Sequence, residues 1–185
     1  MGQTRRTAVV ALGLAMLAGG PPPAFTQEAE TGIPWTQADL QEAFSVGTRI
    51  VYSRSGTGEE GREVGGTHTF EVEDASPEIV DIYSLWEDGG ERSYGTNSLA
   101  WEDAVFLFSH GNAQTKVLGT ESVETPLGTF DTVVVEVSHD FFGTRQTYWM
   151  IADRPGVYAK VVDHGKEESP THLVHTLAEV VPAGS

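Results

Sequence analysis

The chain has 185 residues, a formal net charge of −16 and no cysteine. Its hydrophobic fraction of 39% is enough to form one domain with a buried core, which argues against general disorder. The lack of cysteine excludes disulfides and thiolate metal sites, and the acidic balance disfavours binding to nucleic acid or anionic lipid headgroups.

Residues 1–26 have the order of a cleavable signal peptide. Arg5 and Arg6 precede an apolar run over residues 8–20, which a series of prolines ends. The run is shorter than the roughly 20 apolar residues that a membrane span requires. We therefore predict export to the periplasm or secretion, with a mature start near Gln27 and no transmembrane span after cleavage. Either the general or the twin-arginine route fits, and the absent cysteine excludes a thioether lipid anchor.

The mature chain is predicted to be one domain with short appendages. Residues 27–33 are a polar linker, residues 34–181 a single antiparallel β domain, and residues 182–185 a tail. Cleavage removes two of the 11 basic residues and no acidic residue, so the mature chain carries a net charge of −18. Such a charge favours solubility and is typical of an acidic exported domain.

The domain is predicted to open with one short helix. Thr36 is a suitable N-cap, and Asp39 stands three residues later, as in a capping box. Leu40 and Phe44 then fall on one face. Because a helix of about ten residues is marginal alone in water, we expect it to dock on the sheet through this face and Trp35.

Strand patterns dominate from residue 49 onward. The predicted strands are 49–54, 67–73, 79–86, 93–99, 116–124, 130–137, 144–152, 157–162 and 171–181. Residues 56–66 are predicted to be a loop, and the strand over 130–137 is expected to be central because it is apolar on both faces. Asp88-Gly89-Gly90, Thr125-Pro126-Leu127-Gly128 and Pro155-Gly156 are turn signals.

Residues 101–109 change period. The apolar side chains of this segment recur at helical spacing, at Trp101, Ala104, Val105 and Phe108. This spacing predicts one short internal helix. The predicted fold class is therefore mainly β. We expect a curved antiparallel sheet or half-barrel of about seven to nine strands, with one N-terminal helix and this short internal helix.

Several of these motifs resemble a pattern in uncharacterised exported bacterial proteins. Thr125 to Thr132 read T-P-L-G-T-F-D-T, followed by Tyr148-Trp149-Met150 and by Pro155-Gly156-Val157 with Lys160. The pattern in those proteins runs roughly P-x-G-T-F-D-T, then Y-W, then P-G-x-x-x-K, and the likeness covers most of 34–163. It implies a curved antiparallel sheet similar to the half-barrel of outer-membrane lipoprotein carriers. It implies no catalytic residues, because its motifs are turn and core residues.

The sequence predicts no catalytic, cofactor or metal site. His172 and His175 point to opposite faces of a strand, so a zinc site would need some of His68, His110, His139 and His164 to converge. Ser138-His139-Asp140 places triad residue types side by side, whereas working triads draw them from separate elements. We predict no cofactor, and an enzyme is the weaker alternative.

Aromatic side chains are the most suggestive feature for function. Trp86, Trp101, Phe106 and Trp149 are candidates for lining a cavity, with core packing as the structural alternative. Phe141 and Phe142, at a predicted hairpin tip, are candidates for contacting a partner.

Three functions follow from these features. The first is a non-enzymatic exported binding or envelope module that holds a hydrophobic or lipid-like ligand in a concave sheet. The second is a structural domain that binds an envelope protein. The third is a hydrolase or metal-dependent enzyme whose site forms only in three dimensions.

Overall fold

The computed structural model describes residues 32–109, 113–139, 143–166 and 169–184. The predicted signal peptide and the pair Phe141 and Phe142 lie outside these residues, so they remain predictions. In the described part, no helix combines the length and apolar character needed to cross a bilayer.

Nine strands of the described residues form one antiparallel sheet. They are β1 (Arg49–Thr57), β2 (Glu63–Ala75), β3 (Ile79–Asp88), β4 (Glu91–Ala100), β5 (Gln114–Thr125), β6 (Gly128–His139), β7 (Thr144–Ile151), β8 (Tyr158–Lys166) and β9 (His172–Val181). Their order is β4-β3-β2-β1-β9-β8-β7-β6-β5, so two meanders meet where β1 pairs with β9. The mainly β fold predicted from the sequence is confirmed.

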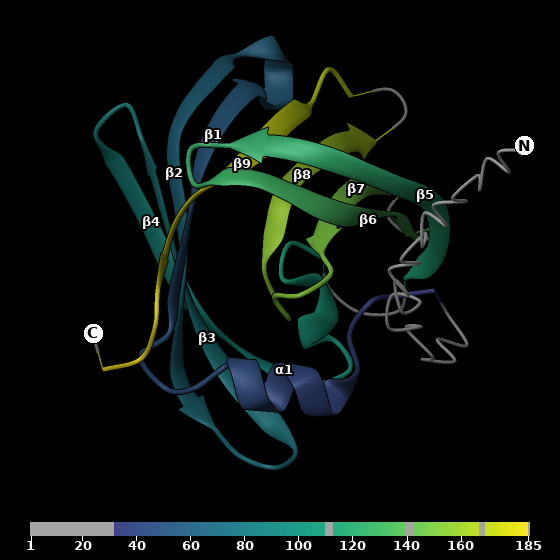
Figure 1. Cartoon of the computed structure of the whole chain (residues 1–185). Helices are drawn as coiled ribbons and strands as arrows, with labels where there is room; N and C mark the ends of the chain where they lie inside the picture. The colour runs from purple at the N-terminus through teal and green to yellow at the C-terminus, as the bar shows by residue number, and fades with distance from the viewer. Residues whose placement is uncertain (1–31, 110–112, 140–142, 167–168, 185) are drawn as a thin grey trace, which may run out of the picture.

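The sheet is strongly bent. Figure 1 shows β1 to β4 forming one wall, β5 to β8 forming the other, and α1 (Gln37–Ala43) lying across one end of the hollow between them. Four of the strand pairs carry register irregularities, which increase the local twist and bending of a sheet. Each of β4 and β5 pairs with one neighbour in the sheet order, so the sheet is an open half-barrel.

The N-terminal helix forms where the capping signals predict it. The Thr36 backbone N–H donates to the Asp39 carboxylate at 2.7 Å, and the Asp39 backbone N–H donates to the Thr36 hydroxyl at 3.2 Å. Leu40 is fully buried, and the Trp35 indole N–H donates to the Ile151 carbonyl at 2.9 Å. The helix is therefore docked on β7 as expected.

The internal helix is present only as a single 3-10 turn, η2 (Ala104–Phe106). Tertiary hydrogen bonds occupy the backbone groups that a longer helix would pair internally. The Tyr158 hydroxyl donates to the Val105 carbonyl at 2.6 Å and accepts the Leu107 N–H at 3.2 Å. The segment 101–109 thus packs inside the hollow of the sheet.

Two details of the strand prediction were wrong. The predicted loop over 56–66 is mostly strand, because β1 and β2 pair as far as Thr57 and Glu63 and only η1 (Glu59–Gly61) and its flanks turn. The strand over 130–137 is not central, since β6 lies beside the edge strand β5. Its second apolar face is buried because Val134 lies opposite Trp149 of β7.

Candidate functional site

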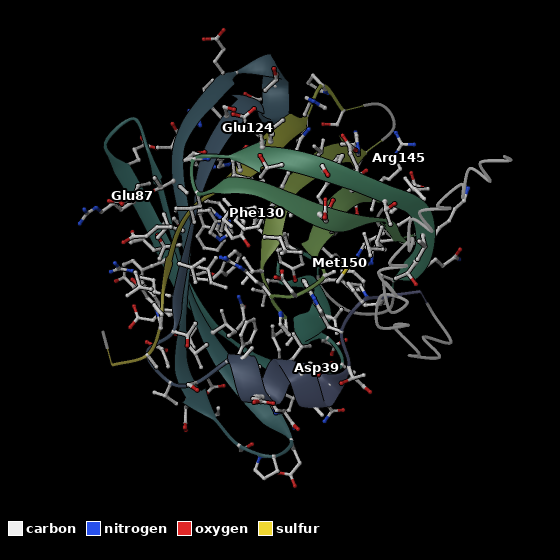
Figure 2. The ribbon with its side chains drawn as sticks, viewed as in Figure 1. Asp39, Glu87, Glu124, Phe130, Arg145 and Met150 are labelled. Atoms are coloured by element: carbon white, nitrogen blue, oxygen red, sulfur yellow. The ribbon has the colours of Figure 1, made fainter. Side chains whose placement is uncertain are left out.

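A cavity of about 220 Å³ lies inside the hollow of the sheet. Side chains fill much of the space between the two walls, as Figure 2 shows, and this cavity is part of what they leave open. The apolar part of its lining is Phe70, Trp86, Leu107, Phe108, Val161 and Leu173. The neutral or cationic polar part is Arg54, His68, Ser84, Asn97, Gln146 and His175.

Strand register brings these distant residues together. Arg54 of β1 lies opposite His175 of β9 on one side and opposite Gly66 of β2 on the other. His68 of β2 lies opposite Trp86 of β3. Directly opposed residues of antiparallel strands share a face, so all these side chains project into the hollow.

His68 is packed among aromatic rings and has no polar partner in the described structure. Its ring centroid lies 4.1 Å from that of Phe70, 4.6 Å from Trp86 and 5.2 Å from Phe108. The residue is 4% exposed, and neither ring nitrogen has a hydrogen-bond partner among the described residues. His68 thus places two unpaired polar atoms on the cavity wall.

His175 completes a pair of buried imidazoles. Its ring lies 5.7 Å from that of His68, and its Nδ1 also has no hydrogen-bond partner among the described residues. Burial lowers the pKa of His68 to about 2, helped by His175 and Arg54. Burial, with the charge of Arg54, lowers the pKa of His175 to about 4. Both rings are therefore neutral near pH 7, and each offers one donor and one acceptor.

Arg54 is the cation of this site. Its Nε is buried without a hydrogen-bond partner, and no carboxylate within the described ranges approaches it as an ion pair. Asp163 lines the same cavity, but its carboxylate accepts the Gly165 backbone N–H at 2.8 Å. Arg49, on the same strand, instead forms an ion pair with Glu179 at 3.7 Å.

A second, wider chamber of about 760 Å³ adjoins the first. Arg54, Asp163 and Leu173 line both, so Arg54 stands at their junction. The lining of the wider chamber includes Arg62, Lys166 and Asp88. An inner chamber with both aromatic and polar walls thus shares Arg54 with an outer chamber that has more charged side chains.

Of the four predicted lining residues, one lies at this cavity. Trp86 forms part of its wall. Trp101 is 2% exposed and donates from its indole to the Ser76 carbonyl at 2.9 Å. Phe106 packs on Tyr148, with ring centroids 5.1 Å apart. These last two are core residues beside the hollow.

The fourth candidate, Trp149, lies on the opposite face of β7 from the buried Tyr148. Its indole N–H donates to Glu121 at 2.8 Å, and the Lys160 ammonium lies 4.5 Å from its ring centroid. Trp149 therefore belongs to the outer surface of the sheet rather than to its hollow.

The remaining histidines do not assemble a metal site in the part of the chain that the structure describes, where no group of three or more potential ligands occurs. His172 is exposed and His175 is buried, as expected for opposite faces of a strand. His139 is buried, and its ring is hydrogen-bonded to the Ser109 hydroxyl. His110 and Asp140 lie outside the described residues.

The sequence did not predict that Arg54, His68 and His175 lie together at one cavity. One signal was present: His68 has the same strand parity as Phe70 and Val72, so alternation alone places it on the apolar face. The pairing of His175 with Arg54 could not be seen, because it depends on register between strands from opposite ends of the domain.

Comparisons with known proteins assign the chain to no family. No protein-family model matches it, and no curated protein matches it. A protein of Bacteroides fragilis with a YmcC-like fold is similar at 8% identity and a TM-score of 0.41, covering 74% of this chain and 96% of that one. A DUF1329 family protein from Desulfovibrio piger is similar at 8% identity and a TM-score of 0.36, covering 80% and 91%.

Proposed function

We propose that the protein is a non-enzymatic, exported binding module that holds a hydrophobic or lipid-like ligand in the hollow of its curved sheet. The observation that carries this proposal is the inner cavity, whose walls combine aromatic rings with buried polar atoms that lack partners. Natural ligand sites are concave and mostly apolar, with a few convergent polar groups. The half-barrel resemblance noted in the sequence agrees with this use of the hollow.

The export part of the proposal rests on residues 1–26. Their basic start and short apolar run are typical of a signal peptide. N-terminal sequencing of protein recovered outside the cytoplasm is expected to find a start near Gln27. An intact Met1 on that material would contradict cleavage.

A binding module for an envelope protein is the second candidate. Strand β5 favours it, because it ends the sheet order of the described strands and its Val117 and Leu118 are 39% and 50% exposed. Unpaired edges can accept a strand from a partner. This candidate predicts complexes with protein and no bound small molecule.

Native mass spectrometry of the mature protein, purified from its own envelope, separates the two candidates. The proposed function predicts an added mass that is released on denaturation. Recovery of the unliganded mass alone would reject the ligand-binding function.

A pair of variants locates any bound mass. Ser84→Leu fills the cavity from β3, because Ser84 is 1% exposed and part of the lining. Thr96→Leu puts the same side chain on an exposed position of the neighbouring strand β4. We expect the first variant to lose the added mass and the second to keep it. Retention of the mass by Ser84→Leu would place the ligand elsewhere.

A further inference from the structure

The inner cavity is too small to hold a ligand of ordinary size by itself. Its volume of about 220 Å³ is below the roughly 300–1,000 Å³ of typical ligand pockets. The cavity and the wider chamber share three lining residues, Arg54, Asp163 and Leu173. A larger ligand that fills this cavity and continues into the wider chamber would pass the Arg54 guanidinium.

The two ends of this path differ in chemistry. The inner end is walled by Phe70, Trp86 and Phe108, and the outer end is lined by charged side chains such as Arg62 and Lys166. An amphipathic molecule can place its apolar body against these rings and its polar end at Arg54. A polar end placed inward would lie against aromatic rings.

The junction provides hydrogen-bond donors that are not used within the described structure. Arg54 Nε is buried without a partner, and its guanidinium has no ion pair with a described carboxylate. His68 and His175 add unpartnered ring nitrogens on the same face. Arg54 as a whole is half-buried, but its Nε is fully buried. A buried unpaired donor costs stability, so a ligand that accepts hydrogen bonds from these atoms would remove a penalty that the empty site carries.

Asp163 is the one carboxylate that lines both chambers, and it would repel an anion. Its oxygen accepts the Gly165 backbone N–H at 2.8 Å, its side chain is half-buried, and it forms no ion pair with Arg54. It therefore leaves the donors of Arg54 unengaged. Arginine also matches the planar geometry of a carboxylate with two parallel hydrogen bonds.

We infer that the ligand of this cavity is an amphipathic carboxylic acid, bound as the carboxylate by Arg54 with an imidazole N–H from His68 or His175, and with its apolar body against Phe70, Trp86 and Phe108. This inference rests on the proposed function and specifies the chemistry of the same site. A fatty acid and a compact aromatic acid share this chemistry.

Titration calorimetry with matched acids and alcohols tests the inference at pH 7. Decanoate and decanol share one apolar body, and 4-phenylbutyrate and 4-phenylbutanol share another. We expect at least one acid to bind ten times or more as tightly as its alcohol. Tighter binding of decanoate identifies a lipid-derived acid, and tighter binding of 4-phenylbutyrate identifies a compact acid.

Two arginines of β1 provide a test variant and its matched control. Arg54→Gln is expected to abolish the preference for the acid while leaving alcohol binding within threefold. Arg49→Gln makes the same change of charge on β1, at a residue that is paired with Glu179 and does not line the cavity. It is expected to keep the full preference. Circular dichroism checks that both variants are folded.

The outcomes separate this inference from the proposed function. Equal binding of acid and alcohol, or a preference that survives Arg54→Gln, overturns the carboxylate assignment and leaves the hydrophobic cavity intact. Absence of binding by all four compounds overturns both. His68→Phe and His175→Phe provide further variants, and at least one of them is expected to weaken acid binding at least threefold without weakening alcohol binding.

Discussion

Burying His68 lowers the stability of the unliganded fold. A neutral imidazole with two unpartnered nitrogens lies between the rings of Phe70 and Trp86. An unsatisfied buried polar group costs about 1–3 kcal/mol. A side chain of similar shape without polar atoms would pack there better, so the presence of histidine is more readily explained by a ligand than by stability.

His68→Phe is therefore expected to stabilise the unliganded protein. We predict a rise of about 1–2 kcal/mol in the free energy of unfolding, because the new ring keeps the contacts and removes the unpaired atoms. Urea denaturation measures this change. His172→Phe, at an exposed position, should alter stability by less than about 0.5 kcal/mol. A destabilised His68→Phe would mean that the imidazole is satisfied.

The two buried histidines also predict how stability depends on pH. Their pKa values are about 2 and about 4 in the folded protein, below the ordinary 6.5. The unfolded chain therefore binds more protons below pH 6.5, and the free energy of unfolding falls as the pH decreases from there. Each histidine should account for about 2 kcal/mol of loss by pH 5. His164, whose pKa burial also lowers, adds a smaller loss of the same sign.

Urea midpoints at pH 7 and pH 5 measure this loss. The double variant His68→Phe/His175→Phe should retain most of its pH 7 stability at pH 5, because carboxylates remain largely ionised in that window. An equally steep loss in the double variant would show that other groups cause the acid sensitivity.

At the scale of elements, the turn before β8 fixes the docking of α1. The Val157 N–H donates to the Arg154 carbonyl at 3.1 Å, and Gly156 has φ +76. A Cβ at Gly156 would lie 2.1 Å from Cε1 of Phe44, at the end of α1. Both the backbone conformation and the close approach of the ring require glycine here.

Gly156→Ala is expected to lower the free energy of unfolding by about 2–5 kcal/mol, from the left-handed backbone and the overlap together. Gly47→Ala separates the two causes, because Gly47 has φ +90 but open space around it. Its cost should be about 1–2 kcal/mol. Equal losses in the two variants, measured by thermal or urea denaturation, would contradict the predicted overlap with Phe44.

Local signals allowed the helix and the turns to be predicted from the sequence. The capping box of Thr36 and Asp39, and the glycines at 89, 90 and 156, act within a few residues. The structure of the segment 101–109 was harder to predict. Its apolar spacing suits a helix, but the hydroxyl of Tyr158 on β8 forms hydrogen bonds with two of its backbone groups. A side chain so distant in sequence cannot be anticipated from periodicity.

The candidate site could be predicted only in part. Aromatic content indicated a lined cavity, and Trp86 does lie on its wall. The cationic group at its junction could not be found, because Arg54 and His175 become neighbours only through the β1–β9 pairing. Composition describes which side chains are available, whereas register decides which of them meet.

At the scale of the whole molecule, the sheet separates an acidic exterior from a hollow with an unpaired cation. The chain carries 27 acidic against 11 basic residues, yet no described carboxylate forms an ion pair with Arg54. Arg54 is half-buried between the two walls of the bent sheet and lines both chambers. Binding of a hydrophobic acid in this hollow is the central claim.

Nuclear Overhauser effects between isotope-labelled mature protein and bound decanoate test that claim most directly. The account predicts contacts from the terminal methyl group to ring protons of Trp86 and Phe108, and from the methylene next to the carboxylate to Arg54. A separate groove beside α1 is lined by Phe44, Ile50, Val180 and Pro182. Contacts confined to that groove or to β5, or no contacts at ligand saturation, would contradict the account.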